Sequence, residues 1–256
     1  MPAPKKIAVV GATGRVGKQT VGILTERGYD VVEISRSQGV DVVTGEGLAT
    51  ALVGVDVIVD AASNPTPDQA EATGFFTASA ENLQREGARA GVRQIVVVSI
   101  IGIDNFAGGY YAAKIEQERV HRAGPVPIKI LRAAQCHEFL GIFIEWCTQG
   151  DVAYLPKMRT QPVAARAVAE VLADLAVDEQ PLDKPWVEIA GPQAETLADV
   201  AAALAAKRGY PAKIEEVSAD DPDQRLAATG ALLPSAGAIL AGPTYAEWLE
   251  TQFASR

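Results

Sequence analysis

Short runs of β-branched and other apolar residues recur along the first half of the chain and predict buried strands. The runs are Ile7–Val10, Val31–Ile34, Val55–Val59 and Ile95–Ser99, with longer helical patterns between them. Each run is apolar on both faces, as expected of parallel strands that helices cover on either side. The alternation of strands and helices predicts right-handed crossover connections. We therefore expect an α/β fold with a doubly wound parallel sheet.

Glycines mark the ends of the predicted helices. The helices and their stops are Gly14–Arg27 before Gly28, Asp68–Ala90 before Gly91, and Tyr110–Arg122 before Gly124-Pro125. Glycine is favoured after a helix because it adopts the left-handed conformation that ends many of them. A further strand is predicted over Ile128–Leu131.

The pattern changes after residue 135 and predicts a smaller α/β lobe. This part contains an aromatic-rich stretch over Phe139–Trp146, alanine-rich helices over Ala164–Ala176 and Leu197–Ala206, and short strands over Trp186–Ile189 and Lys213–Val217. No Gly/Ser-rich linker separates the two parts. We predict a first domain over residues 1–135 and a substrate-binding lobe over residues 136–256, joined as one structural unit.

Composition and charge narrow the class of protein. The chain has 256 residues and a formal net charge of −9, which repels nucleic acid and anionic lipid. The first apolar run is too short for a signal peptide or a membrane span, so a cytoplasmic protein is expected. Cys136 and Cys147 lack metal-binding spacing and are expected to be reduced, and no metal site is predicted.

Three glycines stand between the first predicted strand and the first predicted helix. The turn comprises Gly11, Ala12, Thr13, Gly14, Arg15, Val16 and Gly17. In such a turn the first glycine permits the bend, the second lets the backbone approach a pyrophosphate, and the third lets the helix pack close to the strand. The helix N-terminus then faces the phosphates with free N–H groups. The sequence predicts a Rossmann-type dinucleotide-binding domain, with a turn made only for packing as the alternative.

The end of the second strand favours NADP(H) over NAD(H). An NAD-specific site usually carries an acid there that bonds the ribose 2′-hydroxyl. Here Ser35, Arg36 and Ser37 follow the strand, with Glu33 two residues earlier. The guanidinium of Arg36, with Arg15 as a second candidate, suits a 2′-phosphate because its forked donors match phosphate oxygens. The alternatives are that both arginines are solvated surface residues, or that Glu33 occupies the selecting position.

Small residues follow the strand that begins at Val55. Ala61, Ala62 and Ser63 come directly after Asp60. Small side chains permit close approach of a cofactor ribose, although they suit any crowded strand end. We include these three residues among the predicted cofactor contacts.

A proton-transfer group is predicted from Ser99, Tyr110 and Lys114. Tyr110 and Lys114 are four residues apart and share a helix face, and Ser99 ends a strand. A nearby ammonium lowers the pKa of a phenol toward the working range, and a serine hydroxyl holds a substrate carbonyl. Two alternatives stay open: Tyr111 is the phenol that faces the site, or these side chains are ordinary aromatic and solvated residues.

These residues together resemble the short-chain dehydrogenase/reductase superfamily. The Gly-Ala-Thr-Gly-x-x-Gly spelling, with the segments Trp186–Pro192 and Gly242–Leu249, is similar to its extended and atypical branches, including NmrA-like NAD(P)H-binding proteins. The resemblance implies catalytic Ser99, Tyr110 and Lys114, with Lys114 also on the nicotinamide ribose and Asn82 near a proton relay. It also places substrate contacts after the strand over Ile128–Leu131. The predicted pocket residues are Phe106, Gln135, His137 and Phe139.

Three functions are compatible with this pattern. The first is an NADP(H)-dependent oxidoreductase that reduces a hydrophobic carbonyl or quinone-like molecule. The second is a non-catalytic NADP(H) sensor, since many NmrA-like relatives lack the tyrosine. The third is an isomerase, epimerase or lyase that uses the cofactor transiently. Because the tyrosine and lysine are retained, the sequence favours the first; the oligomeric state, monomer or homodimer, stays open.

Overall fold

The computed structural model describes residues 5–218 and 221–254, and its contacts divide the chain into two compact units. The first unit comprises Met1–Ser99, Ala107–Arg132 and Val168–Val187. The second comprises Ile100–Phe106, Ala133–Ala167 and Glu188–Arg256. Both units are therefore assembled from separate stretches of sequence.

The first unit is built on five strands of the central sheet. They are β1 (Lys6–Val10), β2 (Asp30–Ile34), β3 (Val57–Asp60), β4 (Gln94–Ile100) and β5 (Ile128–Ala133). Their order is β5-β4-β3-β1-β2, and β1 pairs in parallel with both β2 and β3. The chain therefore moves from β1 to one neighbour and then crosses to the other side. In folds of this type, ligands bind at such a reversal, which here lies at the carboxyl ends of β1 and β3.

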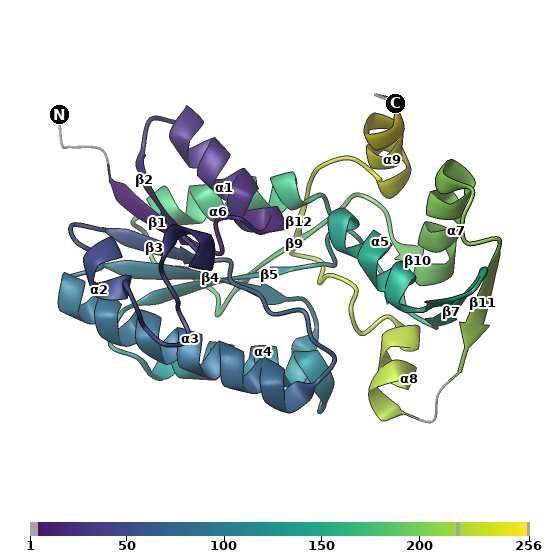
Figure 1. Ribbon diagram of the computed structural model, residues 1–256, viewed down its shortest axis with the longest axis horizontal. Helices are drawn as coiled ribbons and strands as arrows, with labels where there is room; N and C mark the ends of the chain where they lie inside the picture. The colour runs from purple at the N-terminus through teal and green to yellow at the C-terminus, as the bar shows by residue number, and fades with distance from the viewer. Residues whose placement is uncertain (1–4, 219–220, 255–256) are drawn as a thin grey trace. The chain divides into compact units, whose positions relative to one another are not determined.

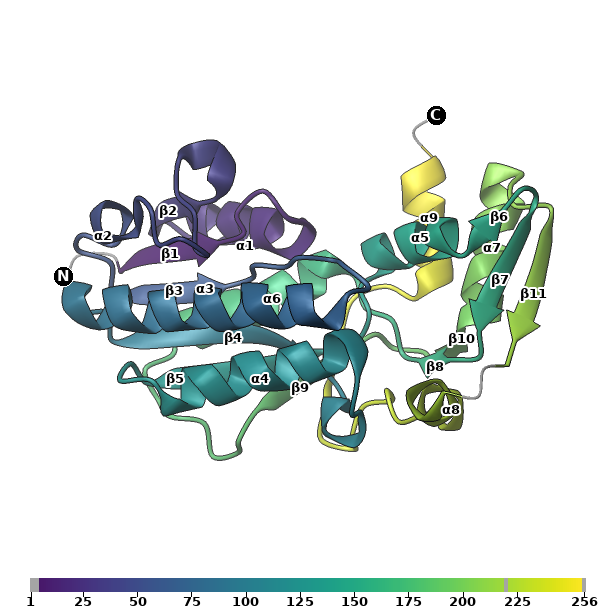
Figure 2. The same cartoon turned by 60° about the horizontal axis from the view of Figure 1, so that its bottom comes forward.

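Helices cover both faces of this part of the sheet. They are α1 (Arg15–Glu26), α2 (Leu48–Ala51), α3 (Gln69–Ala90), α4 (Gly109–Ala123) and α6 (Ala165–Val177), with a 3₁₀ turn η1 (Arg36–Gln38). Figure 1 and Figure 2 show α3 and α4 side by side on one face and α1 and α6 on the other. Strand residues such as Ala8, Ile58 and Ile95 are fully buried, which confirms the prediction of a doubly wound α/β sheet.

The predicted boundaries in this unit agree with the structure to within about three residues, as is normal for element ends. Gly28 and Gly91 follow α1 and α3 with φ of 83° and 79°, the left-handed stops that the sequence indicates. Asp68 caps α3 by accepting a hydrogen bond from Glu71 N–H at 2.8 Å. The helix predicted over Ala164–Ala176 is α6, most of which groups with the first unit although it follows residue 135.

The second unit contains shorter elements. They are η2 (Ile103–Asn105), α5 (His137–Trp146), β6 (Thr148–Gln149), β7 (Val152–Pro156), β8 (Arg159–Thr160), β9 (Val187–Ala190), β10 (Glu195–Thr196), α7 (Leu197–Arg208), β11 (Lys213–Val217), α8 (Pro222–Thr229), β12 (Ile239–Leu240) and α9 (Tyr245–Phe253). Here β11, β7 and β6 form a small sheet, β10 pairs with β8, and β12 pairs with β9. Helix α7 packs against β11, α5 and α9. In the described ranges no helix is long and apolar enough to cross a membrane.

Candidate functional site

The glycine turn between β1 and α1 is as tight as its sequence predicts. Gly11 has φ +72°, and a Cβ added there would lie 2.6 Å from the carbonyl oxygen of Ala61. A Cβ at Gly17 would lie 2.1 Å from the carbonyl oxygen of Gly11. The N–H of Gly14 donates to that same oxygen at 2.8 Å. Only glycine fits at Gly11 and Gly17, because any side chain there would collide with backbone atoms.

The N-terminus of α1 is free to receive an anion. The residues predicted for the turn lie together here: Gly11, Ala12, Thr13, Gly14, Arg15, Val16 and Gly17. The N-cap residue Gly14 has no side chain, and the first turn of α1 contains no acid. The unpaired N–H groups and the positive end of the helix favour a phosphate. The turn therefore fits the pyrophosphate of a dinucleotide.

The end of β2 lies beside the glycine turn. The carbonyl oxygen of Ile34 accepts the N–H of Gly11 at 2.9 Å. Ser35, Arg36 and Ser37 follow directly, and the hydroxyls of Ser35 and Ser37 hydrogen-bond to each other at 2.9 Å. These three predicted cofactor residues thus meet the turn at one edge of the sheet.

Two arginines near this edge carry uncompensated charge. Arg15 and Arg36 are both exposed, and within residues 5–218 and 221–254 neither pairs with a carboxylate. Glu33 is an exposed residue inside β2, two positions before Ser35. The first side chain with charge beyond the strand end is therefore the cation Arg36, which suits a phosphate better than a ribose hydroxyl.

The small residues after β3 allow a close backbone approach. Ala61 N–H donates to Val10 O at 3.1 Å, and the carbonyl oxygen of Ala61 lies against Gly11. Ala62 is buried, whereas Ser63 is exposed. Larger side chains here would press on the glycine turn.

Tyr110, in the first turn of α4, meets Ser63 at the end of β3. The two hydroxyl oxygens are 2.9 Å apart. The Tyr110 ring packs edge-on against Phe76 of α3, with ring centroids 5.5 Å apart. The Tyr110 phenol therefore pairs with a hydroxyl close to the strand ends, and the choice between Tyr110 and Tyr111 as the phenol that faces a substrate stays a prediction.

The amine of Lys114 hydrogen-bonds elsewhere. Its Nζ donates to the carbonyl oxygen of Val98 at 2.7 Å and to the side-chain oxygen of Gln117. It also lies 4.5 Å from the centre of the Phe76 ring. Lys114 is only 4 % exposed, and burial lowers its pKa to about 8 although two carboxylates nearby favour the charged form.

The contacts of Tyr110 and Lys114 do not support the prediction that Lys114 lowers the pKa of Tyr110, which stays a prediction. Burial raises the pKa of the Tyr110 phenol above its ordinary value of 10.0, and the hydrogen bond with Ser63 offsets only part of that rise. The physical reason is that the Lys114 amine donates its hydrogen bonds to Val98 and Gln117. Tyr110 and Lys114 also each contact the ring of Phe76. The predicted contact of Lys114 with a cofactor ribose stays a prediction, since two of the three N–H donors of the ammonium are used by Val98 and Gln117.

A buried polar face of α4 explains the position of Lys114. Its residues recur at i, i+3, i+4 and i+7 and are Lys114, Gln117, Glu118 and His121. The amide of Gln117 accepts from Lys114 and donates to Asp60 of β3 at 2.8 Å. Glu118 accepts two hydrogen bonds from Arg132 of β5, at 2.9 and 2.8 Å. Sequence reasoning missed this network, although four polar residues on one face of a sheet-covering helix were a usable signal.

Asp60 is the carboxylate at the centre of this network. Its Oδ1 accepts Ala62 N–H at 3.1 Å, and its Oδ2 accepts from Gln117 and lies 3.2 Å from Nε2 of His121. Burial acts to raise the pKa of Asp60, but His121 and Lys114 hold it below its ordinary value. Asp60 is therefore an ionised and fully hydrogen-bonded side chain.

Two other residues expected near the reaction have different surroundings: Ser99 is buried without a hydrogen-bond partner among the described residues, and Asn82 makes a structural contact. Ser99 is 2 % exposed, and its Oγ has no hydrogen-bond partner among the described residues. The amide of Asn82 donates to the carbonyl oxygens of Val42 and Val43, at 2.8 Å each. Asn82 thus fastens a loop to α3, and this contact does not support the proton-relay position implied by the resemblance.

The predicted substrate-pocket residues belong to the second unit. Phe106 is buried, and Gln135 accepts a hydrogen bond from Thr160. Burial lowers the pKa of His137 to about 4, so the ring is neutral at neutral pH. Phe139 packs against other aromatic rings of its own helix α5. These side chains pack within the unit, and their contact with substrate stays a proposal.

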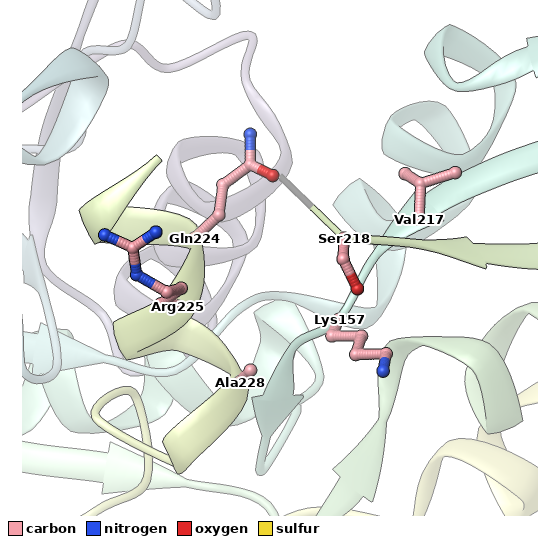
Figure 3. Close-up of a pocket in the computed structure, with 6 residues that line it drawn as sticks. All are labelled: Lys157, Val217, Ser218, Gln224, Arg225 and Ala228. Atoms are coloured by element: carbon pink, nitrogen blue, oxygen red, sulfur yellow. The ribbon is translucent and has the colours of Figure 1, made fainter. Parts of the chain in front are cut away.

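A pocket of the second unit has a different lining. Figure 3 shows the six side chains around it: Lys157, Val217, Ser218, Gln224, Arg225 and Ala228. None of the four predicted substrate residues is among them. Sequence patterns did not indicate this pocket because its residues come from a strand end, a loop and α8, far apart along the chain.

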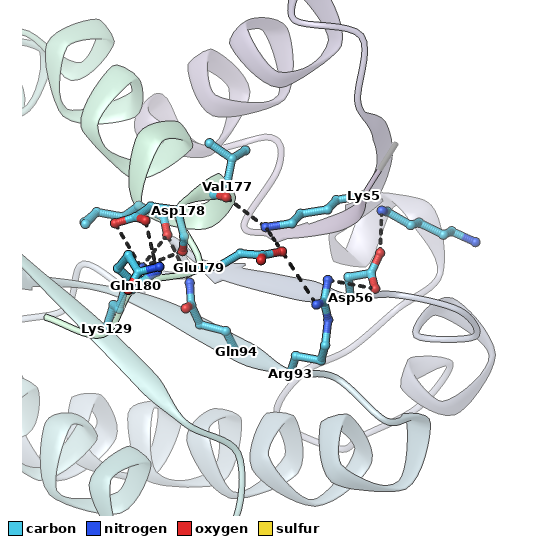
Figure 4. A network of polar contacts seen from close by, with 11 residues as sticks. Lys5, Asp56, Arg93, Gln94, Lys129, Val177, Asp178, Glu179 and Gln180 are labelled. Carbon is cyan, nitrogen blue, oxygen red and sulfur yellow. Dashed lines mark hydrogen bonds and ion pairs between the residues drawn. The ribbon is translucent and has the colours of Figure 1, made fainter. Parts of the chain in front are cut away.

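Charged residues also gather at the amino end of the strands in the first unit, as Figure 4 shows. Lys5 lies 3.2 Å from Glu179, which also faces Arg93. The buried amine of Lys129 donates to the carbonyl oxygen of Asp178 at 2.6 Å. These cations are satisfied by carboxylates and by carbonyls near the end of α6, so this network ties α6 to the sheet.

A family model described as NAD(P)H-binding matches residues 11–179. No curated protein matches the chain by sequence.

Solved structures share the fold at low sequence identity. An NADP-bound dTDP-4-dehydrorhamnose reductase from Bacillus anthracis has a TM-score of 0.72 at 14 % identity, covering 99 % of this chain and 100 % of the other. An NADPH-bound quinone oxidoreductase from Escherichia coli has a TM-score of 0.71 at 18 % identity, with 96 % and 99 % covered. A UDP-N-acetylglucosamine 4-epimerase from Bacillus cereus has a TM-score of 0.70 at 18 % identity, with 98 % and 96 % covered. These likenesses establish the fold.

Proposed function

Because the chain belongs to the NAD(P)H-binding family, we propose that it is an NADP(H)-dependent oxidoreductase that reduces a carbonyl or quinone-like small molecule. The observation that carries this proposal is the pair of hydroxyls on Ser63 and Tyr110, 2.9 Å apart, at the same strand ends as the glycine turn. Solved structures of similar fold include a quinone oxidoreductase and a reductase of a nucleotide sugar. The activities of these two proteins support the proposal that this chain reduces its substrate.

The residues at the strand ends fit the cofactor. Gly11, Gly14 and Gly17 leave room for a pyrophosphate against backbone N–H groups, where any Cβ would intrude. Arg36, with Arg15, would pair with the 2′-phosphate, which favours NADP(H) over NAD(H). The remaining predicted contacts of the cofactor lie around them: Ala12, Thr13, Val16, Ser35, Ser37, Ala61, Ala62 and Ser63.

When bound, the reduced nicotinamide supplies a hydride to an electrophilic carbon. Tyr110 supplies the proton that the resulting alkoxide oxygen needs. Burial raises the pKa of this phenol, so it keeps its proton at neutral pH until an alkoxide, a much stronger base, develops beside it. Lys114 acts at a distance in this mechanism, because its amine fastens α4 to the strand that contains Val98.

The test is oxidation of NADPH in the presence of candidate substrates, followed by absorbance. The panel should contain quinones, simple hydrophobic carbonyls and a 4-keto nucleotide sugar. Tyr110→Phe removes the proton and should lower kcat by about 100-fold while leaving NADPH affinity unchanged. If Tyr110→Phe turns over as fast as the wild type, Tyr110 is not the acid, and if the wild type itself oxidises NADPH with no member of the panel, the reductase function is wrong.

A second function, sensing of the NADP(H) redox state without catalysis, is favoured by one observation. The amine of Lys114 is occupied by Val98 and Gln117, so the tyrosine lacks the activation that the family resemblance implies. A sensor would bind NADPH and NADP⁺ with different affinity and oxidise NADPH with no member of the panel. Calorimetry with both nucleotides distinguishes these outcomes.

A further inference from the structure

The hydroxyl that meets Tyr110 is not the one that the family resemblance implies. Ser63 is exposed and lies 2.9 Å from the Tyr110 oxygen. Ser99 is 2 % exposed, and its oxygen is fully enclosed. A substrate carbonyl can reach the first hydroxyl from solvent but not the second.

One carboxylate joins the loop that contains Ser63 to the helix that contains Tyr110. Asp60 accepts Ala62 N–H at 3.1 Å through one oxygen, which fixes the chain just before Ser63. Its other oxygen accepts from Gln117 at 2.8 Å, and Gln117 lies two turns after Tyr110 on α4. One buried side chain therefore hydrogen-bonds to both the loop and the helix.

Further hydrogen bonds hold both partners from the α3 side. Glu71 accepts from Asn64 at 3.0 Å and from Thr66 at 3.1 Å, which ties down the loop after Ser63. Gln69 accepts the N–H of Gly109 at 2.8 Å, directly before Tyr110. The loop is thus braced on both sides of the serine.

We propose that Ser63 is the hydroxyl through which Tyr110 delivers its proton, and that Asp60 is a positioning residue for this pair. The proposal rests on the proposed reductase function. As the alkoxide forms, the Ser63 O–H bond breaks toward it and a new O–H bond forms on the product. The proton of Tyr110 moves to the serine oxygen in the same step, and the phenolate left behind takes a proton from solvent.

The first experiment compares Ser63→Ala, Ser63→Thr and Ser99→Ala with the wild type. Ser63→Ala should lower kcat by about 100-fold, and Ser63→Thr should restore most of it because the hydroxyl is kept. Ser99→Ala should change kcat by less than about threefold, since a buried hydroxyl without a partner is dispensable. Nicotinamide fluorescence should give the same NADPH Kd for the wild type and Ser99→Ala, within about twofold, and kcat of the two Ser63 variants is compared at saturating NADPH because Ser63 is also a predicted cofactor contact.

A spectroscopic readout does not depend on knowing the substrate. The ultraviolet difference signal of tyrosinate, with Tyr110→Phe in each background as the blank, reports the ionisation of Tyr110 alone. Removing the Ser63 hydroxyl removes a hydrogen bond that lowers the pKa of Tyr110, so Ser63→Ala should move this titration to higher pH. Ser99→Ala should leave it in place.

The role of Asp60 is tested by exchanging the donor and the acceptor in its hydrogen bond with Gln117. Asp60→Asn keeps an acceptor for Ala62 but places N–H groups opposite the N–H groups of Gln117. It should lower kcat by about tenfold and shift the Tyr110 titration. The double variant Asp60→Asn with Gln117→Glu restores a donor–acceptor pair and the same total charge, and should recover most of both losses.

The outcomes separate the two proposals. If the wild type oxidises NADPH with no member of the panel, the reductase function itself fails. If the wild type is active and Tyr110→Phe is equally active, the reductase function stands and the proton route through Tyr110 and Ser63 is overturned. If Tyr110→Phe is inactive while Ser63→Ala is active and Ser99→Ala is not, Ser99 is the partner and the inference is overturned. If the Tyr110 titration is the same in Ser63→Ala, or if Asp60→Asn matches the wild type in both readouts, the corresponding half of the proposal is wrong.

Discussion

The two ends of the strands in the first unit use charge in opposite ways. At the amino end, Lys5, Arg93 and Lys129 face carboxylates or backbone carbonyls (Figure 4). At the carboxyl end, Arg15 and Arg36 are exposed without a carboxylate partner in the part of the chain that the structure describes. Both ends belong to the same sheet and share its strands.

The difference in charge pairing matches a difference in the role we propose for each end, which is attachment of a helix at the amino end and binding of an anion at the carboxyl end. A cation already paired within the protein contributes to attachment of a helix, here α6, and has little left to offer a ligand. A cation beside an uncapped helix N-terminus adds to a positive potential that the protein itself leaves unbalanced. The contrast supports the proposal that the cofactor binds at the carboxyl end.

The largest expected effect on NADPH affinity comes from a substitution in the glycine turn at the carboxyl end, at Gly17. Gly17→Ala places a Cβ 2.1 Å from the carbonyl oxygen of Gly11, so the helix and the turn must separate. NADPH affinity should fall by about 100-fold or more, and the free energy of unfolding should fall by about 3 kcal/mol. Nicotinamide fluorescence and urea unfolding measure the two effects.

Gly22, on the same helix, provides the matched control. A Cβ there meets nothing within 4 Å. Gly22→Ala should leave NADPH affinity unchanged and raise the free energy of unfolding by up to about 1 kcal/mol, since alanine is the better helix former. Equal loss of NADPH binding in both variants would mean that α1 tolerates no change and that the turn has no special role.

The next largest expected effect is a loss of NADPH affinity on substitution of Arg36, one of the two exposed cations at the carboxyl end. Arg36→Ala removes a charged donor to the 2′-phosphate, so NADPH binding should weaken by about tenfold, or 1.4 kcal/mol, while NADH binding stays the same. Titration of each nucleotide into both proteins gives the four constants. Equal weakening for NADPH and NADH would show that Arg36 contributes general charge and does not select the 2′-phosphate.

The fold was predictable because its signals are local. The apolar runs, the glycine stops and the glycine turn each determine structure within a few residues of themselves. The second unit was harder, because it combines the stretches Ile100–Phe106, Ala133–Ala167 and Glu188–Arg256. Nothing in the alanine-rich pattern of α6 indicates which unit its residues will join.

The site was predictable only in part. Tyr110 and the strand ends follow from motif and periodicity, but the partner of Tyr110 depends on which of two serines the sheet buries. Ser99 is inside a strand that helices cover, whereas Ser63 has already left its strand. The direction of Lys114 depends on Val98, which is distant in sequence, and on Gln117, whose amide donates to the equally distant Asp60.

Lys114 belongs to neither group of charges, because its amine is buried within the unit. A substitution at Lys114 asks whether this buried charge affects stability more than the exposed ion pairs at the amino end. Its native pKa of about 8 is below the ordinary 10.5, so between these pH values the unfolded chain binds more protons than the native one. Stability due to this group should therefore rise with pH over that window, by at most about 1.4 kcal/mol per unit. Urea unfolding of wild type and Lys114→Met at pH 7 to 10 should show the wild type gaining relative to the variant, and parallel curves would contradict the buried amine.

The smallest effect is expected at the amino end, at Glu179. Its carboxylate is exposed and lies 3.2 Å from Lys5 and 3.7 Å from Arg93. Glu179→Gln should lower the free energy of unfolding by less than about 1 kcal/mol, and by less still in high salt, because solvent and ions screen exposed pairs. NADPH affinity should be unchanged, since the charges at this end are already paired near the end of α6 and lie outside the proposed cofactor site. A tenfold loss of NADPH affinity, equal to that expected for Arg36→Ala, would remove the distinction between the two ends, because charge anywhere on the unit would then act on the cofactor.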